Sequence, residues 1–213
     1  MISDTKKIIF IHIPKTGGSS LEVMWKDFSV DKISTFNRKG LNTMVNLKEG
    51  GDIYNKFSKM DSFALNYKHA TALEMRKLYP KKFNEYYKIS IVRNTYERLL
   101  SLHLWKNNDK FNRDLFLNDL KSPLIRPTWG AEKYLCDLEG NIIIDKIIDL
   151  KDLKEEYDNL NKKFNFNKNL IHINKTTHNH YSYYYDKKLI DEIQNRYSKE
   201  IELFDFKFLN KKI

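Results

Sequence analysis

The stretch Ile8–Leu21, IIFIHIPKTGGSSL, decides the fold of this 213-residue chain. An apolar, β-branched run ends at Pro14, and Lys15, two glycines and two serines follow before a helix-like segment begins. This order predicts a buried strand, a tight turn and the N-terminus of a helix. Such a turn directs several backbone N–H groups and the positive end of the helix dipole at one point, which suits a phosphate or sulfate. The stretch therefore predicts a site for a nucleotide-like anion.

The position of Lys15 distinguishes this turn from the Walker A loop. In that loop the lysine follows the glycines, as G-x-x-x-x-G-K-[ST]. Here Lys15 precedes Gly17 and Gly18, and Ser19 and Ser20 begin the helix, which disfavours an ordinary P-loop NTPase. On spacing alone, a plain glycine turn with Ser19 as the helix N-cap is an equal alternative.

A second segment, Ile89–Ser101, places an arginine at the end of a predicted strand and a serine eight residues later. Eight helical residues rise about 12 Å, so Arg93 and Ser101 meet around one phosphate only if the intervening Asn94–Glu97 segment bends. Arginine binds a phosphate through two parallel hydrogen bonds, and a hydroxyl can add another. Taken alone, the segment is explained at least as well by a surface arginine and a serine on a helix face.

The rest of the chain alternates strands with helices, which favours an α/β sandwich around a mostly parallel sheet. The length fits one domain over residues 1–213. A hairpin is expected over Tyr134–Ile144, with its turn at Glu139–Asn141. The predicted strands are Ile8–Ile13, Tyr86–Val92 and Leu170–Asn174, and the predicted helices are Ser19–Phe28, Ala70–Leu78, Thr95–Asn107, Phe111–Leu120, Leu150–Phe164 and Lys187–Arg196.

The composition favours a folded, soluble protein that meets anions. Of its residues, 41% are hydrophobic, which is enough for a core, and the formal net charge is +10. That charge favours nucleotide phosphates, sulfated or carboxylated glycans or nucleic acid, although a bias toward lysine explains it as well. A single cysteine, Cys136, excludes an internal disulfide. The apolar runs are too short to span a bilayer and no signal peptide is visible, so a cytoplasmic location is expected.

Taken together, the two segments resemble the sulfotransferases that use 3′-phosphoadenosine 5′-phosphosulfate (PAPS). The nearest likeness is to the carbohydrate branch, which includes the heparan 2-O and chondroitin enzymes. Pro14–Ser20 matches the strand–P-K-T-G-G-[ST]-[ST]–helix loop of that family, and Val92–Ser101 matches its V-R-N-P-x-[DE]-R-L-x-S segment. Thr95 stands where the family usually has proline, which should loosen the turn. The resemblance implies a P-loop-like three-layer sandwich.

The likeness continues in order along most of the chain. Tyr67–Ala72 resembles the family segment G-H-x-[ST], and Ile125–Asn141 resembles its R-P-Q…L-C-D-x-x-G-N region, with Thr128 where glutamine is common. His172–Thr176 resembles part of the C-terminal region of these enzymes. From this last match we expect Lys175 and Thr176 to touch the cofactor.

The resemblance implies roles for the residues of the two main motifs. Lys15 would contact the 5′-phosphate and stabilise the charge that develops as the S–O bond breaks. The 5′-phosphosulfate would be held by backbone N–H groups of Thr16, Gly17, Gly18, Ser19 and Ser20, together with the two serine hydroxyls. Arg93 and Ser101 would hold the 3′-phosphate. No metal is expected, because lysine and the helix dipole replace it.

The acceptor hydroxyl needs a base, and His69 is the first candidate. Its ordinary pKa of about 6.5 suits proton removal near neutrality, and the carbohydrate 2-O-sulfotransferases are similar in using histidine. A capping or core histidine is the alternative interpretation. Glu22, on the first helix, is the reserve base, and His12 is expected to be a packed core residue.

The function favoured by these observations is transfer of a sulfuryl group from PAPS to a hydroxyl acceptor, with a carbohydrate preferred and 3′-phosphoadenosine 5′-phosphate as product. A P-loop phosphotransferase is one alternative, disfavoured because Lys15 precedes the glycines and no aspartate convincingly ends a strand. A non-enzymatic basic glycan-binding protein is another, which leaves Lys15 and the Arg93–Ser101 pair without a use. Nucleic acid is not expected as a partner.

Overall fold

The computed structural model describes residues 1–25, 69–121, 128–170 and 178–211. In these residues a four-stranded sheet forms the centre of the molecule, in the order β1-β2-β3-β4. The three longer strands run parallel, whereas the first pairs antiparallel with its neighbour. The strands are β1 (Ile2–Ser3), β2 (Ile8–Ile11), β3 (Tyr87–Val92) and β4 (Lys146–Asp149).

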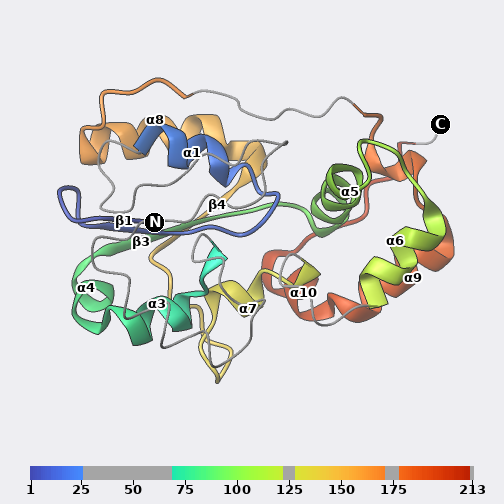
Figure 1. Cartoon of the computed structure of the whole chain (residues 1–213), viewed down its shortest axis with the longest axis horizontal. Coiled ribbons are helices and arrows are strands. Elements are labelled where there is room, and N and C mark those ends of the chain that lie inside the picture. The colour runs from blue at the N-terminus through green and yellow to red at the C-terminus, as the bar shows by residue number, and fades with distance from the viewer. Residues whose placement is uncertain (26–68, 122–127, 171–177, 212–213) are drawn as a thin grey trace.

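Helices cover both faces of the sheet, so the molecule has three layers (Figure 1). One face carries α1 (Gly18–Trp25) and α8 (Leu153–Phe164), and the opposite face carries α3 (Ala72–Leu78), α4 (Pro80–Glu85) and α7 (Glu132–Leu135). The predicted α/β, P-loop-like sandwich with a mostly parallel sheet is confirmed.

A helical region extends beyond one edge of the sandwich (Figure 1). It consists of α5 (Thr95–Lys106), α6 (Arg113–Lys121), α9 (Lys187–Arg196) and α10 (Ser198–Phe204), with the 3-10 helix η5 (Tyr181–Tyr183). A hydrophobic cluster around Tyr96, Phe116 and Tyr185 holds this region together. Because α5 directly follows β3, the region is connected to the end of a central strand.

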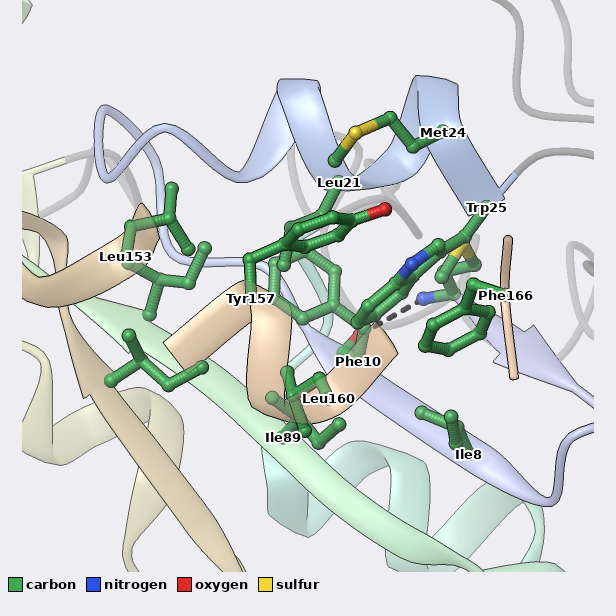
Figure 2. Packing of buried hydrophobic residues seen from close by; sticks show 13 residues of the cluster. Ile8, Phe10, Leu21, Met24, Trp25, Ile89, Leu153, Tyr157, Leu160 and Phe166 are labelled. Atoms are coloured by element: carbon green, nitrogen blue, oxygen red, sulfur yellow. Dashed lines mark hydrogen bonds between the residues drawn. The ribbon is translucent and has the colours of Figure 1, made fainter. Parts of the chain in front are cut away.

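The alternation of side chains along β2 divides the core into two clusters. Ile8 and Phe10 face the layer of α1 and α8, whereas Ile9 and Ile11 face the opposite layer. Figure 2 shows Phe10 among side chains from α1 and α8. Trp25 at the end of α1 stacks on Phe166, with 4.6 Å between ring centroids. The strand β2, which leads into the glycine turn, is therefore buried on both faces.

Local sequence signals explain where several elements begin. Thr71 and Glu74 form a reciprocal capping box at the start of α3, and Pro80 opens α4. The Asn94 side chain accepts a hydrogen bond from the Tyr96 N–H and caps α5, and Asp186 caps α9 in the same way.

Most of the predicted elements agree with the structure in kind, with differences at their boundaries, and two predicted strand regions differ. The helix Lys187–Arg196 has the expected bounds, and Leu150–Phe164 begins with the short 3-10 helix η4 (Leu150–Asp152). The expected hairpin Tyr134–Ile144 keeps its turn but begins in α7, so only Cys136 and Ile142 pair as a bridge. Leu170 is not in a strand, and residues 171–174 of that predicted strand lie outside the described residues.

The sheet contains a strand that the sequence did not indicate. β4 (Lys146–Asp149) pairs parallel with β3, with Val92 opposite Asp149. Among the described helices, none has both the length and the apolar character needed to cross a membrane.

Candidate active site

The turn after β2 has the backbone shape of an anion-binding loop. Lys15 and Gly17 both have positive φ, 68° and 79°, on either side of Thr16. Alternating backbone conformations of this kind turn successive N–H groups toward one side. Thr16 is fully buried and its hydroxyl donates to the Ile13 carbonyl at 2.8 Å, so it fixes the loop from within. The loop leads into the first turn of α1, whose N–H groups point the same way as the helix dipole.

Neither glycine of the loop has room for a side chain, because atoms of neighbouring residues lie too close. A Cβ on Gly17 would lie 2.8 Å from the Leu150 Cδ1, and its positive φ also disfavours other residues. A Cβ on Gly18 would lie 2.5 Å from the His12 Cδ2, so the His12 ring occupies the space that the missing side chain leaves. Ser20 at the start of α1 is buried, and Ser19 is partly buried.

The structure brings the two sequence motifs together. β2 and β3 are parallel neighbours, so the segments after Ile11 and after Val92 emerge at the same edge of the sheet. Arg93 donates from Nη1 to the backbone carbonyl of Lys15 at 3.3 Å, and its Nε donates to Glu97 at 3.2 Å. The arginine of the second motif thus contacts the loop of the first.

The chain turns at Asn94, as the meeting of Arg93 and Ser101 around one phosphate requires. Asn94 has φ −42° and ψ 127°, outside the helical region, and α5 begins immediately afterwards. Ser101 lies buried on α5. Its role toward a phosphate stays a prediction, as do the roles of Lys175 and Thr176, which lie outside the described residues.

An aromatic ring lies beside the loop lysine. The Lys15 Nζ is 5.4 Å from the centroid of the Trp105 ring, within the range of a cation–π interaction. Trp105 is 41% exposed although it is a large apolar residue. Sequence reasoning missed this residue, and the signal that could have found it is its place one helical turn after Ser101 on the same face.

His69 is held with a defined tautomer. Its Nδ1 lies 2.9 Å from the backbone carbonyl oxygen of His12. Because a carbonyl can only accept, Nδ1 carries the proton, and the Nε2 of the neutral ring keeps its lone pair. The imidazole rings of His12 and His69 also meet edge to face, with 4.6 Å between their centroids. This arrangement suits a proton acceptor at Nε2.

Glu22, the reserve candidate, is bound to His12. Its Oε1 lies 2.8 Å from the His12 Nδ1, and both side chains are almost fully buried. His12 is buried as predicted, but it is one member of a polar pair and not a purely packed residue. Sequence reasoning missed this contact.

Among the described residues, no group of three or more His, Cys, Asp or Glu side chains could hold a metal ion. Burial raises the pKa of the Cys136 thiol, and Glu132 and Asp137 raise it further, so this cysteine is a poor nucleophile.

A strand-ending aspartate is present that the sequence did not reveal. Asp149 closes β4, but its carboxylate accepts from the Lys151 N–H at 3.1 Å and caps the η4 turn. It also forms an ion pair with the Lys151 side chain, at 3.4 Å. Its observed contacts therefore assign it a capping role.

Comparison with known proteins identifies the family. A sequence model described as "Sulfotransferase family" matches residues 1–136, which is more than half of the chain. No curated protein and no solved structure gave a match. The matched region contains the glycine loop, His69, Arg93 and Trp105. The chain therefore belongs to the sulfotransferase family and is an enzyme that transfers sulfuryl groups.

Proposed function

We propose that this sulfotransferase moves the sulfuryl group of PAPS to a hydroxyl of a carbohydrate, with His69 as the base. The observation that carries the donor assignment is the hydrogen bond from Arg93 to the Lys15 carbonyl. It joins a loop suited to one phosphate or sulfate with an arginine suited to a second, separate phosphate. A nucleotide with phosphates on both its 5′ and 3′ positions fits that arrangement.

The 5′-phosphosulfate binds the loop, where the N–H groups of Thr16–Ser19 and the helix dipole favour negative charge. The Ser20 N–H donates to the Gly17 carbonyl at 3.0 Å, so Ser20 contributes through its hydroxyl. Arg93 uses Nε and one Nη1 N–H for Glu97 and Lys15, and the guanidinium has further N–H groups for the 3′-phosphate. Ser101 adds a hydroxyl on the following helix. Lys15 stabilises the charge on the bridging oxygen as the bond to sulfur breaks.

His69 takes the proton of the acceptor hydroxyl at Nε2. The acceptor oxygen then forms its bond to sulfur, while the bond between sulfur and the 5′-phosphate oxygen breaks. The products are a sulfate ester and 3′-phosphoadenosine 5′-phosphate, and the proton remains on His69 until solvent removes it. The Nδ1–H bond to the His12 carbonyl supports this role because it leaves Nε2 unprotonated in the neutral ring.

The exposed Trp105 ring supports a carbohydrate acceptor. An acceptor must reach the sulfur from the side opposite the leaving oxygen, in the neighbourhood of Lys15. Sugar rings have apolar C–H faces, and an indole offers a rigid apolar surface with a polar N–H at its edge. Trp105 provides that surface next to the Lys15 ammonium.

A transfer assay tests the proposal. Labelled PAPS is incubated with the chain and a panel of desulfated polysaccharides, and label in the polysaccharide is counted. We expect wild-type transfer, a loss of about 10²- to 10⁴-fold in kcat for His69→Ala, and a comparable or larger loss for Lys15→Ala. Lys187→Ala, a lysine-to-alanine change at the exposed start of α9, is the matched control.

Two results would contradict the proposal. One is transfer that persists at the wild-type rate in Lys15→Ala. The other is transfer of phosphate from ATP in place of sulfate from PAPS, which would return the loop to the phosphotransferase alternative.

A further inference from the structure

One imidazole lies between the cofactor loop and the base. The His12 ring fills the space next to Gly18, and the His12 backbone carbonyl accepts the Nδ1–H of His69. The rings of His12 and His69 are also in edge-to-face contact. His12 thus touches both halves of the proposed reaction site, the half that holds the donor and the half that activates the acceptor.

Glu22 fixes the orientation of this imidazole. Glu22 lies on α1, three residues after Ser19. Its Oε1 is 2.8 Å from the His12 Nδ1. His12 follows β2, so the contact joins the strand end to the helix that the loop leads into. A rotation of the His12 ring would push against Gly18 and move the N–H groups of the first helical turn.

Stability gives little reason for such a pair. Removing a carboxylate and an imidazole from water carries a desolvation cost, and well-packed apolar side chains of similar volume commonly stabilise a core as well or better. Here the exposed fractions of the two side chains are 4% and 2%. A costly pair at the contact between loop and base points to a role in the reaction.

We propose that His12 and Glu22 form a positioning pair that sets the phosphosulfate loop and the base His69 relative to each other. The proposal rests on the sulfotransfer function proposed above. Neither side chain touches the reacting atoms. Glu22 orients the His12 ring, and the ring supports Gly18 on one side and the His69 ring on the other. Glu22 is accordingly assigned to positioning and not to proton removal.

Glu22→Gln tests the pair, because it keeps the size of the side chain and removes its charge. A misplacement of about 1 Å can cost on the order of 100-fold in rate, so we expect kcat to fall by about 10- to 100-fold. The affinity for 3′-phosphoadenosine 5′-phosphate, measured by calorimetry, reports on the loop without any catalysis. We expect it to weaken by about tenfold, similar to losses of supporting contacts around other sites.

A double-mutant cycle separates positioning from general damage. If Glu22 acts on kcat through His69, Glu22→Gln should lower kcat little further in a His69→Ala background. A purely structural defect would lower kcat by the same factor in both backgrounds. Glu200→Gln is the matched control, because Glu200 is an equally buried carboxylate whose ion-pair partner, Arg98, belongs to the helical region and not to the loop. We expect it to leave both kcat and the ligand affinity unchanged.

The outcomes distinguish this proposal from the proposed function. If the wild-type chain transfers no sulfuryl group, the proposed function is overturned, and the positioning role with it. Active wild type together with unchanged kcat and ligand affinity in Glu22→Gln would overturn the positioning role alone. If Glu22→Gln does not fold, His12→Asn replaces it, since the asparagine amide can still meet Glu22 while the ring next to Gly18 is lost. Unchanged kcat and affinity in His12→Asn would also overturn the positioning role.

Discussion

Two buried pairs, each of a basic and an acidic side chain, lie in different parts of the molecule, and they differ in what surrounds them. His12 and Glu22 lie at the end of β2, beside the loop glycines and the proposed base. Arg98 and Glu200 lie in the helical region, where they join α5 to α10 with a 3.1 Å contact and both side chains are fully buried. The Tyr197 ring lies against the Arg98 guanidinium, with 5.9 Å between the ring centroid and the Arg98 Cζ.

The chemistry of the basic residue in each pair matches these surroundings. Arginine keeps its charge at any physiological pH, so Arg98 and Glu200 make a permanent contact between segments that are 102 residues apart. The His12 ring packs against Gly18 of the loop and against the ring of His69, so its pair is in contact with the proposed site. A buried pair alone thus does not identify a site, and the neighbouring glycines, base and loop do.

The largest effect is expected from Arg98→Met. The substitution leaves Glu200 buried without its cation, and breaking a buried pair in this way costs about 3–5 kcal/mol of unfolding free energy. Burial already raises the pKa of the Glu200 carboxyl, and Arg98 opposes that rise. Urea denaturation measures the loss. Arg98→Met with Glu200→Leu should recover most of it, and a double variant no more stable than the single one would contradict this interpretation.

Gly18→Ala probes the other pair. The added Cβ would meet the His12 ring, and overpacking of this kind costs about 1–3 kcal/mol. We expect weaker binding of 3′-phosphoadenosine 5′-phosphate as well, because the loop must move. His12→Ala in the same chain should relieve part of the cost in stability. The expected contact between ring and loop would be wrong if Gly18→Ala were equally costly with and without the His12 ring.

A third polar contact, between the buried His103 and the partly exposed Asp119, makes stability depend on pH. Burial lowers the pKa of His103, opposed by Asp119 and assisted by Lys106. The unfolded chain therefore binds more protons as the pH falls below the ordinary histidine value of about 6.5, so stability is full above that value and declines below it. The His103 Nε2 also accepts from the Asn112 N–H at 3.0 Å, which protonation would break.

Urea denaturation at pH 8 and pH 5.5 measures this effect. His103→Gln should reduce the difference in unfolding free energy between the two pH values. An identical pH dependence in His103→Gln and wild type would contradict the assignment.

The smallest effect is expected from Thr95→Pro, at the start of α5. Thr95 is buried, and its hydroxyl oxygen has no hydrogen-bond partner among the described residues. The first helical position suits proline, and the φ and ψ of Asn94 are compatible with a following proline. We expect a gain of about 0.4–1 kcal/mol, read from the thermal midpoint. Thr95→Ala separates the loss of the hydroxyl from the effect of the ring.

Local patterns in the sequence predicted much of the site. The order strand, glycine turn and helix is encoded in consecutive residues, and so is the position of Arg93 at a strand end. The meeting of Lys15 and Arg93 then follows from parallel neighbouring strands, whose carboxyl ends share one edge of a sheet. These predictions depend on adjacent residues and on one general rule of topology.

Two kinds of contact could not be predicted in this way: those that depend on which face a helix turns toward its neighbour, and those between residues far apart in the sequence. The pairing of His12 with Glu22 depends on which face of α1 turns toward the strand end. Arg98 lies on α5 and Glu200 on α10, and among the described residues four α-helices separate these two elements along the chain. β4 was missed because it has only four residues, and its sequence Lys-Ile-Ile-Asp does not show the alternation of apolar and polar side chains that predicts a strand. Each case needs the tertiary structure to choose among local possibilities.

Calorimetry with 3′-phosphoadenosine 5′-phosphate, with 5′-AMP and ATP as comparison ligands and Arg93→Ala as the variant, tests whether the loop and Arg93 form one site for a nucleotide with phosphates on both positions. Such a site predicts binding that requires the 3′-phosphate and weakens strongly in Arg93→Ala, while 5′-AMP binds both forms of the chain equally weakly. Equal affinity for the ligands with and without a 3′-phosphate, or a preference for ATP with magnesium, would contradict it.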